Sequence, residues 1–189
     1  MQSSEFNNLF RAEFAEPLFE HGFQMVGRGS SMHHVNDTRE LLILRQGGRL
    51  ARQGVARSVI CFRHTFLRPI ESEDPAKKSI YVEDCPRKLT FDDFEGWVRP
   101  VLNYQPENSG RWRIHDVNYA SLGSAKLCAR LKKLRTIVIK RVLPWTQSLT
   151  EESELSQIKR FGENAWCEQR WIEDYENFLS YKNSQLPFV

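Results

Sequence analysis

The stretch that most constrains the fold is residues 39–67, in which two strand-like runs flank a loop rich in glycine and arginine. The first run, RELLILRQ, has leucine or isoleucine at every position from 41 to 44. A strand covered on both faces has this near-continuous apolar pattern, so we predict a central strand over 39–46. The second run, VARSVICFRHTFL, alternates between two faces and predicts a neighbouring strand over 55–67. One of its faces carries Ile60, Phe62, His64 and Phe66, and the other carries Val59, Cys61, Arg63 and Thr65.

Apolar residues at helical spacing precede this pair of strands. Phe6, Phe10 and Phe14 predict an N-terminal helix, which Pro17 bends or continues into a second turn and Gly22 ends. Two short strands over 23–26 and 31–35 are then expected to form a hairpin. Further short elements are expected as strands over 79–83 and 111–117 and as a helix from Phe91 to about Leu102.

Helical patterns dominate the last third of the chain. The clearest helix is predicted to begin at Ser124 and to end at Pro144, because leucine and valine recur every three or four residues. Thr150, followed by two glutamates, predicts the start of another helix, which Gly162 interrupts. The apolar face of a final helix is expected to contain Ala165, Trp166, Ile172, Tyr175 and Leu179.

These patterns predict an α+β fold in one domain, residues 1–189. An antiparallel sheet flanked by the N-terminal helix and further helices forms the core over 1–122, and a helical subregion over 123–189 packs on it. A hydrophobic content of 40% with 12% aromatic residues is enough for a packed core and argues against disorder.

The four cysteines, Cys61, Cys85, Cys128 and Cys167, form no CxxC pair and are expected to be reduced and mostly buried. The N-terminus lacks the basic and apolar segments of a signal peptide, and no run of about 20 apolar residues is present. We therefore expect a cytoplasmic protein without a membrane partner.

Charge is distributed unevenly along the chain. Residues 150–189 contain eight acids and four bases, a net charge of −4, and since the whole chain carries +3 the first 149 residues carry +7. The asymmetry can indicate a body that binds a polyanion. We favour the alternative that the acidic C-terminal helices fold back onto the basic helix that begins at Ser124.

A family resemblance rests on the N-terminal helix that ends in EPLFEHGFQMVGR (residues 16–28), on the two strands around 41–46 and 58–66, and on Cys85, Arg87 and Trp97. Over roughly its first two-thirds the chain resembles a bacterial domain family to which no activity is assigned. The resemblance implies a helix-flanked antiparallel sheet and implies no catalytic residues.

Several histidines are candidate carriers of chemistry. His33 and His34, with Asp37, suggest a metal pair, but adjacent residues of a strand point to opposite faces, so a polar hairpin is favoured. His64 and His115 could meet across the sheet, with Cys61 or Asp116, as the base and nucleophile of a hydrolase. Half-buried histidines that complete their own hydrogen bonds are the favoured interpretation of both.

Acidic and glycine-rich motifs point to no cofactor. Asp92 and Asp93 begin the helix at Phe91, where capping explains them. The loop glycines match neither GxxxxGK[ST] nor GxGxxG, so we predict neither a nucleotide cofactor nor a metal.

The candidate binding residues are basic, and they are Arg49, Arg52 and Arg57 in the loop and Lys132, Lys133 and Arg135 on the long helix. Such residues can contact phosphates, which makes nucleic-acid binding one hypothesis. The favoured hypothesis is a non-enzymatic interaction or accessory domain that binds another protein, with immunity to a toxin as one such role. A hydrolase using His64 and His115 is the third. The sequence leaves the oligomeric state open.

Overall fold

The computed structural model describes residues 1–26, 31–46, 54–70, 82–89, 91 and 115–185. The order of its elements begins with α1 (Ser3–Phe10), the π-helical turn η1 (Arg11–Ala15) and α2 (Glu16–Phe19). The strands are β1 (Phe23–Val26), β2 (Ser31–Asn36), β3 (Arg39–Gln46), β4 (Val55–His64), β5 (Arg87–Leu89) and β6 (His115–Asn118), with a 3-10 turn η3 (Val82–Asp84) before β5. The C-terminal helices are α4 (Ser124–Ile137), the π-helical turn η5 (Val138–Val142), α5 (Leu143–Ser148), α6 (Glu151–Phe161), the 3-10 turns η6 (Gly162–Ala165) and η7 (Glu168–Trp171), and α7 (Ile172–Ser184).

The described residues form a six-stranded antiparallel sheet, which confirms the predicted α+β class. Strands β1 to β4 follow one another as a meander, and β3 pairs with β4 from Arg39↔His64 to Gln46↔Arg57. Two short strands share the remaining edge of β4, because β6 pairs with its first half and β5 with its second half. The predicted pair of strands is therefore the centre of the sheet.

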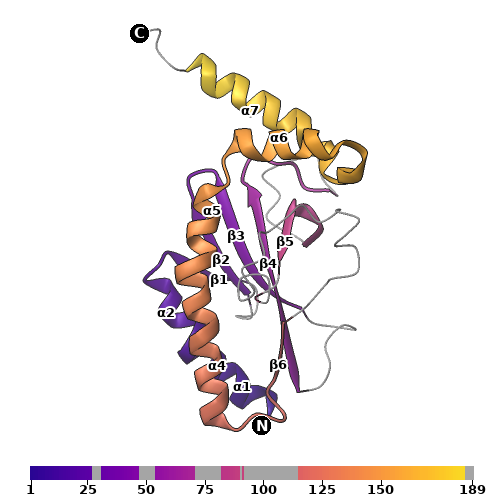
Figure 1. The fold of residues 1–189 in the computed structure, drawn as a ribbon. Coiled ribbons are helices and arrows are strands. Elements are labelled where there is room, and N and C mark those ends of the chain that lie inside the picture. The colour runs from indigo at the N-terminus through magenta and orange to yellow at the C-terminus, as the bar shows by residue number, and fades with distance from the viewer. Residues whose placement is uncertain (27–30, 47–53, 71–81, 90, 92–114, 186–189) are drawn as a thin grey trace.

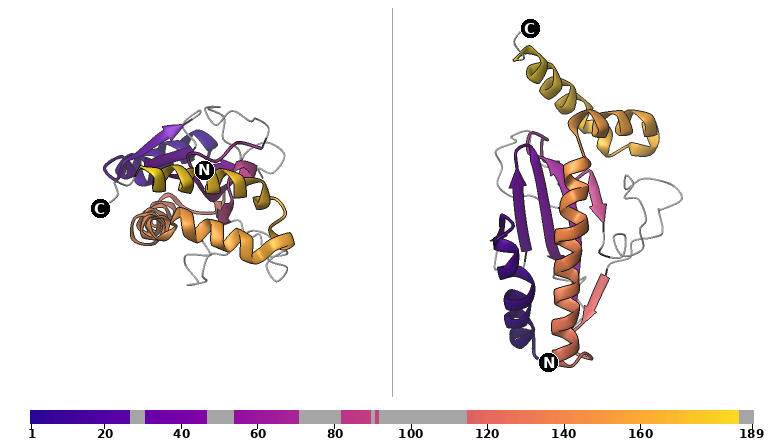
Figure 2. Two further views of the ribbon diagram at one scale, coloured as in Figure 1. Left: turned by 90° about the horizontal axis from the view of Figure 1, so that it is seen from above. Right: turned by 60° about the vertical axis from the view of Figure 1, so that its left-hand side comes forward.

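Both faces of this sheet are covered, as the apolar run from 41 to 44 predicts. Leu41 and Ile43 belong to the larger core, with Ile60, and pack under α1, η1, α4 and η5. Leu42 lies on the opposite face in a smaller core with Val59, Cys61 and Cys85. Figure 2 shows α4 and α5 running along the length of the sheet, with α1 and α2 beside them.

Two prolines lie inside continuous helices, each directly after a π-helical turn. Pro17 is in the first turn of α2, after η1, and Pro144 is in the first turn of α5, after η5. The prediction that Pro144 ends the helix is therefore wrong, since the helix continues to Ser148. A proline lacks the N–H that would bond to the carbonyl four residues earlier, and the wider π-turn accommodates that carbonyl.

The C-terminal helices form a second layer of packing at one end of the sheet (Figure 1). Thr150 caps α6 by accepting from the Ser153 amide at 3.1 Å, while the Ser153 hydroxyl accepts from the Thr150 amide at 3.0 Å. Their core contains Leu67, Ile158, Ala165, Trp171 and Tyr175. The far end of α7 projects beyond the rest of the molecule (Figure 1).

Several sequence expectations are corrected or untested. Val82–Asp84 is a 3-10 turn, so the strand expected over 79–83 is wrong at its last two positions, and its first three lie outside the described residues. Of the helix expected from Phe91 to Leu102, only Phe91 is described. The strand expected over 111–117 is described only from His115 onward, as β6.

Candidate functional site

The predicted basic loop lies mostly outside the described residues, which exclude Arg49, Arg52 and the side chain of Arg57. The backbone of Arg57 belongs to β4 and pairs with Asp116 of β6.

The basic helix is predicted to contact a ligand through Lys132, Lys133 and Arg135, but Lys132 and Arg135 both contact Glu13 of the same chain. The Lys132 ammonium lies 3.6 Å from the Glu13 carboxylate. A guanidinium N–H of Arg135 donates to the main-chain carbonyl of Glu13 at 2.9 Å. Glu13 is the fourth residue before Pro17. In an α-helix the N–H of residue 17 would donate to the Glu13 carbonyl, but proline lacks this N–H, and Arg135 donates to the carbonyl instead. Lys132 and Arg135 therefore hold α4 against η1.

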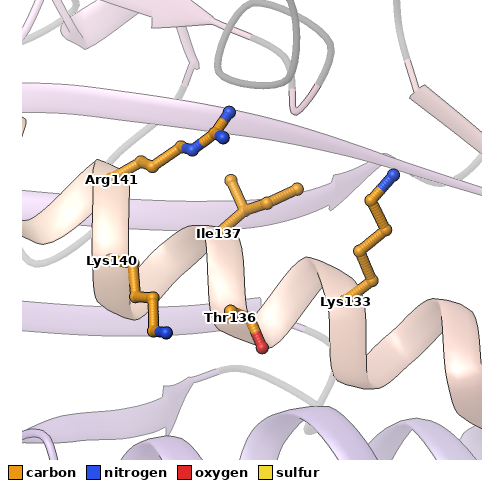
Figure 3. A pocket seen from close by; sticks show the side chains of 5 residues that line it. All are labelled: Lys133, Thr136, Ile137, Lys140 and Arg141. Atoms are coloured by element: carbon orange, nitrogen blue, oxygen red, sulfur yellow. The ribbon is translucent and has the colours of Figure 1, made fainter.

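Lys133 is on a different side of the same helix. It lines a hollow of about 270 Å³ together with Thr136, Ile137, Lys140 and Arg141 (Figure 3). These residues follow one another at helical spacing across α4 and η5, which contain seven basic residues and no acid. Three cationic side chains therefore surround an apolar one at this hollow.

His64 is fully buried and is hydrogen-bonded to the C-terminal helix α7. Its Nδ1 lies 3.0 Å from the Tyr175 hydroxyl, 111 residues along the chain. Burial lowers the pKa of His64 to about 4, so the ring is neutral at neutral pH. Burial also raises the pKa of the Tyr175 phenol, which keeps its proton. The Nε2 atom is buried and has no hydrogen-bond partner among the described residues.

A buried ion pair lies in the same part of the molecule. Arg87 of β5 donates to the Glu154 carboxylate of α6 through two N–H groups, at 2.8 and 2.6 Å, and also to the side-chain oxygen of Gln157. The side chains of Arg87 and Glu154 are 2% and 1% exposed. This bidentate pair joins the sheet to α6 without contact with solvent.

Glu151 makes a second polar contact between α6 and the sheet. Its carboxylate accepts from the Thr38 hydroxyl at 2.6 Å and lies 3.3 Å from the Lys182 ammonium of α7. Burial alone would raise the pKa of Glu151, but the hydrogen bonds from Thr38, from the backbone and from Lys182 lower it to about 2. Glu151 is therefore ionised throughout the neutral range.

These contacts correct the expected pairing of acidic and basic helices. The C-terminal acids contact Arg87 and Thr38 of the sheet region, Arg68 just beyond β4, or lysines of their own helices. No ion pair between the described part of α4 and the acids after residue 150 is present. The acidic residues of the C-terminal helices and the basic residues of α4 therefore contact different neighbours.

The other face of the sheet carries a smaller polar cluster. His33 Nε2 lies 2.6 Å from a Glu40 carboxylate oxygen across the strands, and the second oxygen lies 3.4 Å from Arg63. His34 points to the opposite face, where its ring packs 4.9 Å from that of Phe23. The two histidines therefore cannot share an ion, and no group of three potential ligands lies together among the described residues.

The four cysteines are free, as expected, but only Cys61 and Cys85 are buried, whereas Cys128 and Cys167 are partly exposed. Burial raises the pKa of the Cys85 thiol, and the neighbouring Cys61 raises it further. Cys85 is therefore a poor nucleophile at neutral pH.

The proposed hydrolase pair does not converge. His115 pairs with Ser58, six residues before His64 on the same strand, which corresponds to about 20 Å at the usual rise per residue. Cys61 and His64 lie three residues apart and hence on opposite faces of β4. Neither His115 nor Cys61 can act with His64 in this arrangement.

Two aromatic side chains on the C-terminal helices are exposed. Trp166 is 67% exposed and Tyr181 is 64% exposed. The prediction that Trp166 belongs to the apolar face of a helix is wrong, because residues 162–171 contain two 3-10 turns and Trp171 fills the core instead. Gly162, which interrupts the preceding helix, is a signal in the sequence that this register could fail.

Sequence reasoning misses the partners of His64 and the Arg87–Glu154 pair because they are far apart along the chain.

In the described segments, no helix combines the length and apolar character needed to cross a membrane. Comparison with protein-family models, with curated proteins and with solved structures finds no match to this chain.

Proposed function

We propose that this chain is a protein-binding domain without catalytic activity of its own, and that its contact surface lies on the C-terminal helices. The observation that carries the proposal is the exposure of Trp166, which is 67% exposed in the turn between α6 and α7. Tryptophan and tyrosine contribute large contact areas at interfaces and are frequent among the residues that dominate binding energy. Tyr181, on the projecting end of α7, is the second such residue.

The attachment of these helices supports the same proposal. Two buried contacts, Arg87–Glu154 and His64–Tyr175, join α6 and α7 to the sheet, and the partly buried contact Thr38–Glu151 adds to them. The Trp171 indole N–H also donates to the Arg68 carbonyl at 2.8 Å. Because a surface that is rigid before binding loses less conformational entropy, these contacts favour a preformed interface.

Charge does not select the partner, because the exposed charges of the C-terminal helices are balanced. The exposed acids are Glu152, Glu163, Glu173 and Glu176, and the exposed bases are Lys159, Arg160, Arg170 and Lys182. The net charge of −4 in the segment 150–189 therefore comes from its buried acids. We propose a partner protein with a pocket that accepts an aromatic side chain. The four free cysteines fit a reducing compartment such as the cytoplasm for this encounter.

The proposal is tested by affinity capture with the whole chain, followed by calorimetry with the purified partner. Trp166→Ala and Tyr181→Ala are each expected to raise the Kd about tenfold or more, as for central interface aromatics. Phe19→Ala is the matched control, since Phe19 is an exposed aromatic (43%) on α2, outside the proposed surface. A partner that binds all three variants equally, or the absence of any saturable partner, contradicts the proposal.

Nucleic-acid binding is a second candidate, favoured by the hollow that Lys133, Lys140 and Arg141 line (Figure 3). Combined Lys133→Ala and Lys140→Ala substitutions should weaken binding of a labelled oligonucleotide in fluorescence anisotropy, and added salt should weaken it further. Lys132→Ala is the control, because that lysine lies outside the lining of the hollow, near Glu13. Absence of binding at low salt would remove this candidate.

A further inference from the structure

A small polar hollow on the body of the protein is built by four separate elements. It has a volume of about 170 Å³ and lies where the turn after α2, the adjoining ends of β2 and β3, and α5 meet. Its lining residues are His21, His34, Asn36, Arg39, Leu41, Leu143, Thr146 and Gln147. At about 30 Å³ for each water molecule, the volume corresponds to roughly five or six waters, which is enough for a small ion.

Arg39 gives this hollow a permanent positive charge. Its Nε donates to the Leu149 carbonyl at 3.2 Å, which fixes the direction of the guanidinium. The two Nη groups have no acceptor in the described part of the chain, and the described lining contains no carboxylate. A positioned guanidinium that retains its paired donors matches the geometry of an oxyanion.

His34 is held beside this arginine by its surroundings. Its ring packs against Phe23 and against Gly22, where an added Cβ would approach His34 Cδ2 to 3.3 Å. Gly22 has a φ of +81°, so glycine is suited to the position both in conformation and in space. Burial, and to a lesser extent the neighbouring His33, lower the pKa of His34, whereas an anion in the hollow would raise it and favour the protonated ring.

The remaining polar groups add donors around the same space. Asn36 and Gln147 reach the hollow from β2 and α5, and no hydrogen bond engages their side-chain amides among the described residues. The Thr146 hydroxyl is already used, because it donates to the Leu143 carbonyl at 2.8 Å. His21 is exposed at the turn after α2 and is available to an ion that enters from solvent.

We propose that this hollow binds a small oxyanion, either phosphate or a carboxylate group, between Arg39 and the two histidines His21 and His34. The neutral amides of Asn36 and Gln147 complete the set of donors, and Leu41 and Leu143 form the apolar wall. The site is separate from the exposed aromatic residues of the C-terminal helices, so its occupation does not depend on the proposed protein partner.

Calorimetric titration of the whole chain with sodium phosphate and with sodium acetate tests the proposal, with sodium chloride at matched ionic strength as the reference. Saturable one-to-one binding of phosphate or acetate is expected, and the stronger of the two identifies the oxyanion class. Arg39→Gln should weaken binding at least about tenfold, the effect of losing a charged hydrogen bond.

Because Arg39 also bonds to Leu149, His21→Ala provides an independent variant at an exposed position, and it should weaken binding severalfold. Arg11→Gln is the control, since it removes an exposed arginine that is paired with Glu16 outside the hollow, and it should bind as the unmodified chain does. Absence of saturable binding beyond that of chloride overturns the proposal. Equal losses in His21→Ala and Arg11→Gln, or no loss in His21→Ala, would overturn it as well.

Discussion

Removing the charge of Glu154 should destabilise the protein far more than removing an equivalent charge at the surface. Glu154→Gln keeps the shape of the side chain but leaves the Arg87 guanidinium, which is 2% exposed, without its counter-charge. Breaking a buried ion pair by removing one partner typically costs about 3–5 kcal/mol. Since a domain of this kind has a free energy of unfolding of about 5–15 kcal/mol, the loss is a large part of the total.

Urea unfolding followed by tryptophan fluorescence and circular dichroism measures this loss. With a slope of about 2 kcal/mol per molar urea, the midpoint should fall by roughly 1.5–2.5 M. Glu176→Gln is the matched control, because the Lys159–Glu176 pair has the same 2.6 Å separation but side chains that are 51% and 49% exposed. An exposed pair contributes about 0–1 kcal/mol, so its midpoint should barely move.

Replacing both residues of the pair provides a second comparison. The double variant Arg87→Met with Glu154→Leu should recover most of the lost stability, since apolar side chains of similar volume can replace a buried ion pair. The reasoning is refuted if Glu154→Gln and Glu176→Gln shift the midpoint equally, because burial would then make no difference to the contribution of the pair.

Three further perturbations give distinct outcomes. The pKa of His64 is about 4 in the folded chain, against an ordinary histidine value of 6.5, so the unfolded chain binds a proton at this residue first as the pH falls. The free energy of unfolding should therefore decrease by about 3 kcal/mol as the pH drops from 6.5 to 4. The urea midpoint of His64→Leu should vary less across this range. Arg135→Met should lower the free energy of unfolding by about 1–3 kcal/mol, because the Glu13 carbonyl loses its donor, and thermal unfolding checks this. Gly54→Ala should cost more than about 1 kcal/mol, since φ is +80° and an added Cβ would overlap that of Ala120, and adding Ala120→Gly should recover part of the loss.

The local elements of the fold could be predicted because their residues repeat with a clear period. The apolar run at 41–44 and the alternation after Val55 place β3 and β4 at the centre of the sheet. Helix α4 follows from its leucine spacing in the same way. Strand β5 is missed, because it has only three residues, two of them charged, and such a segment has no pattern to detect.

Long-range polar contacts could not be predicted, because periodicity assigns residues to faces and not to partners. Arg87 and Glu154 are separated by 67 positions, and each alone resembles a solvated surface charge. The candidate hollow illustrates the same limit. No pattern in the sequence connects His34 with Arg39, and the approach of His21 and Gln147 depends on how α2 and α5 pack against the sheet.

The shared edge of β4 has a consequence for the order in which the chain folds. Strands β1 to β4 pair with neighbours that are close in sequence, so this meander closes only short loops. Strand β6 and the helices α6 and α7 reach the same sheet across about 60 to more than 110 residues, and such distant closures form slowly because of their entropic cost. During synthesis from the N-terminus, the meander can therefore assemble first, and His64 and Arg87 acquire their partners only when the last forty residues arrive.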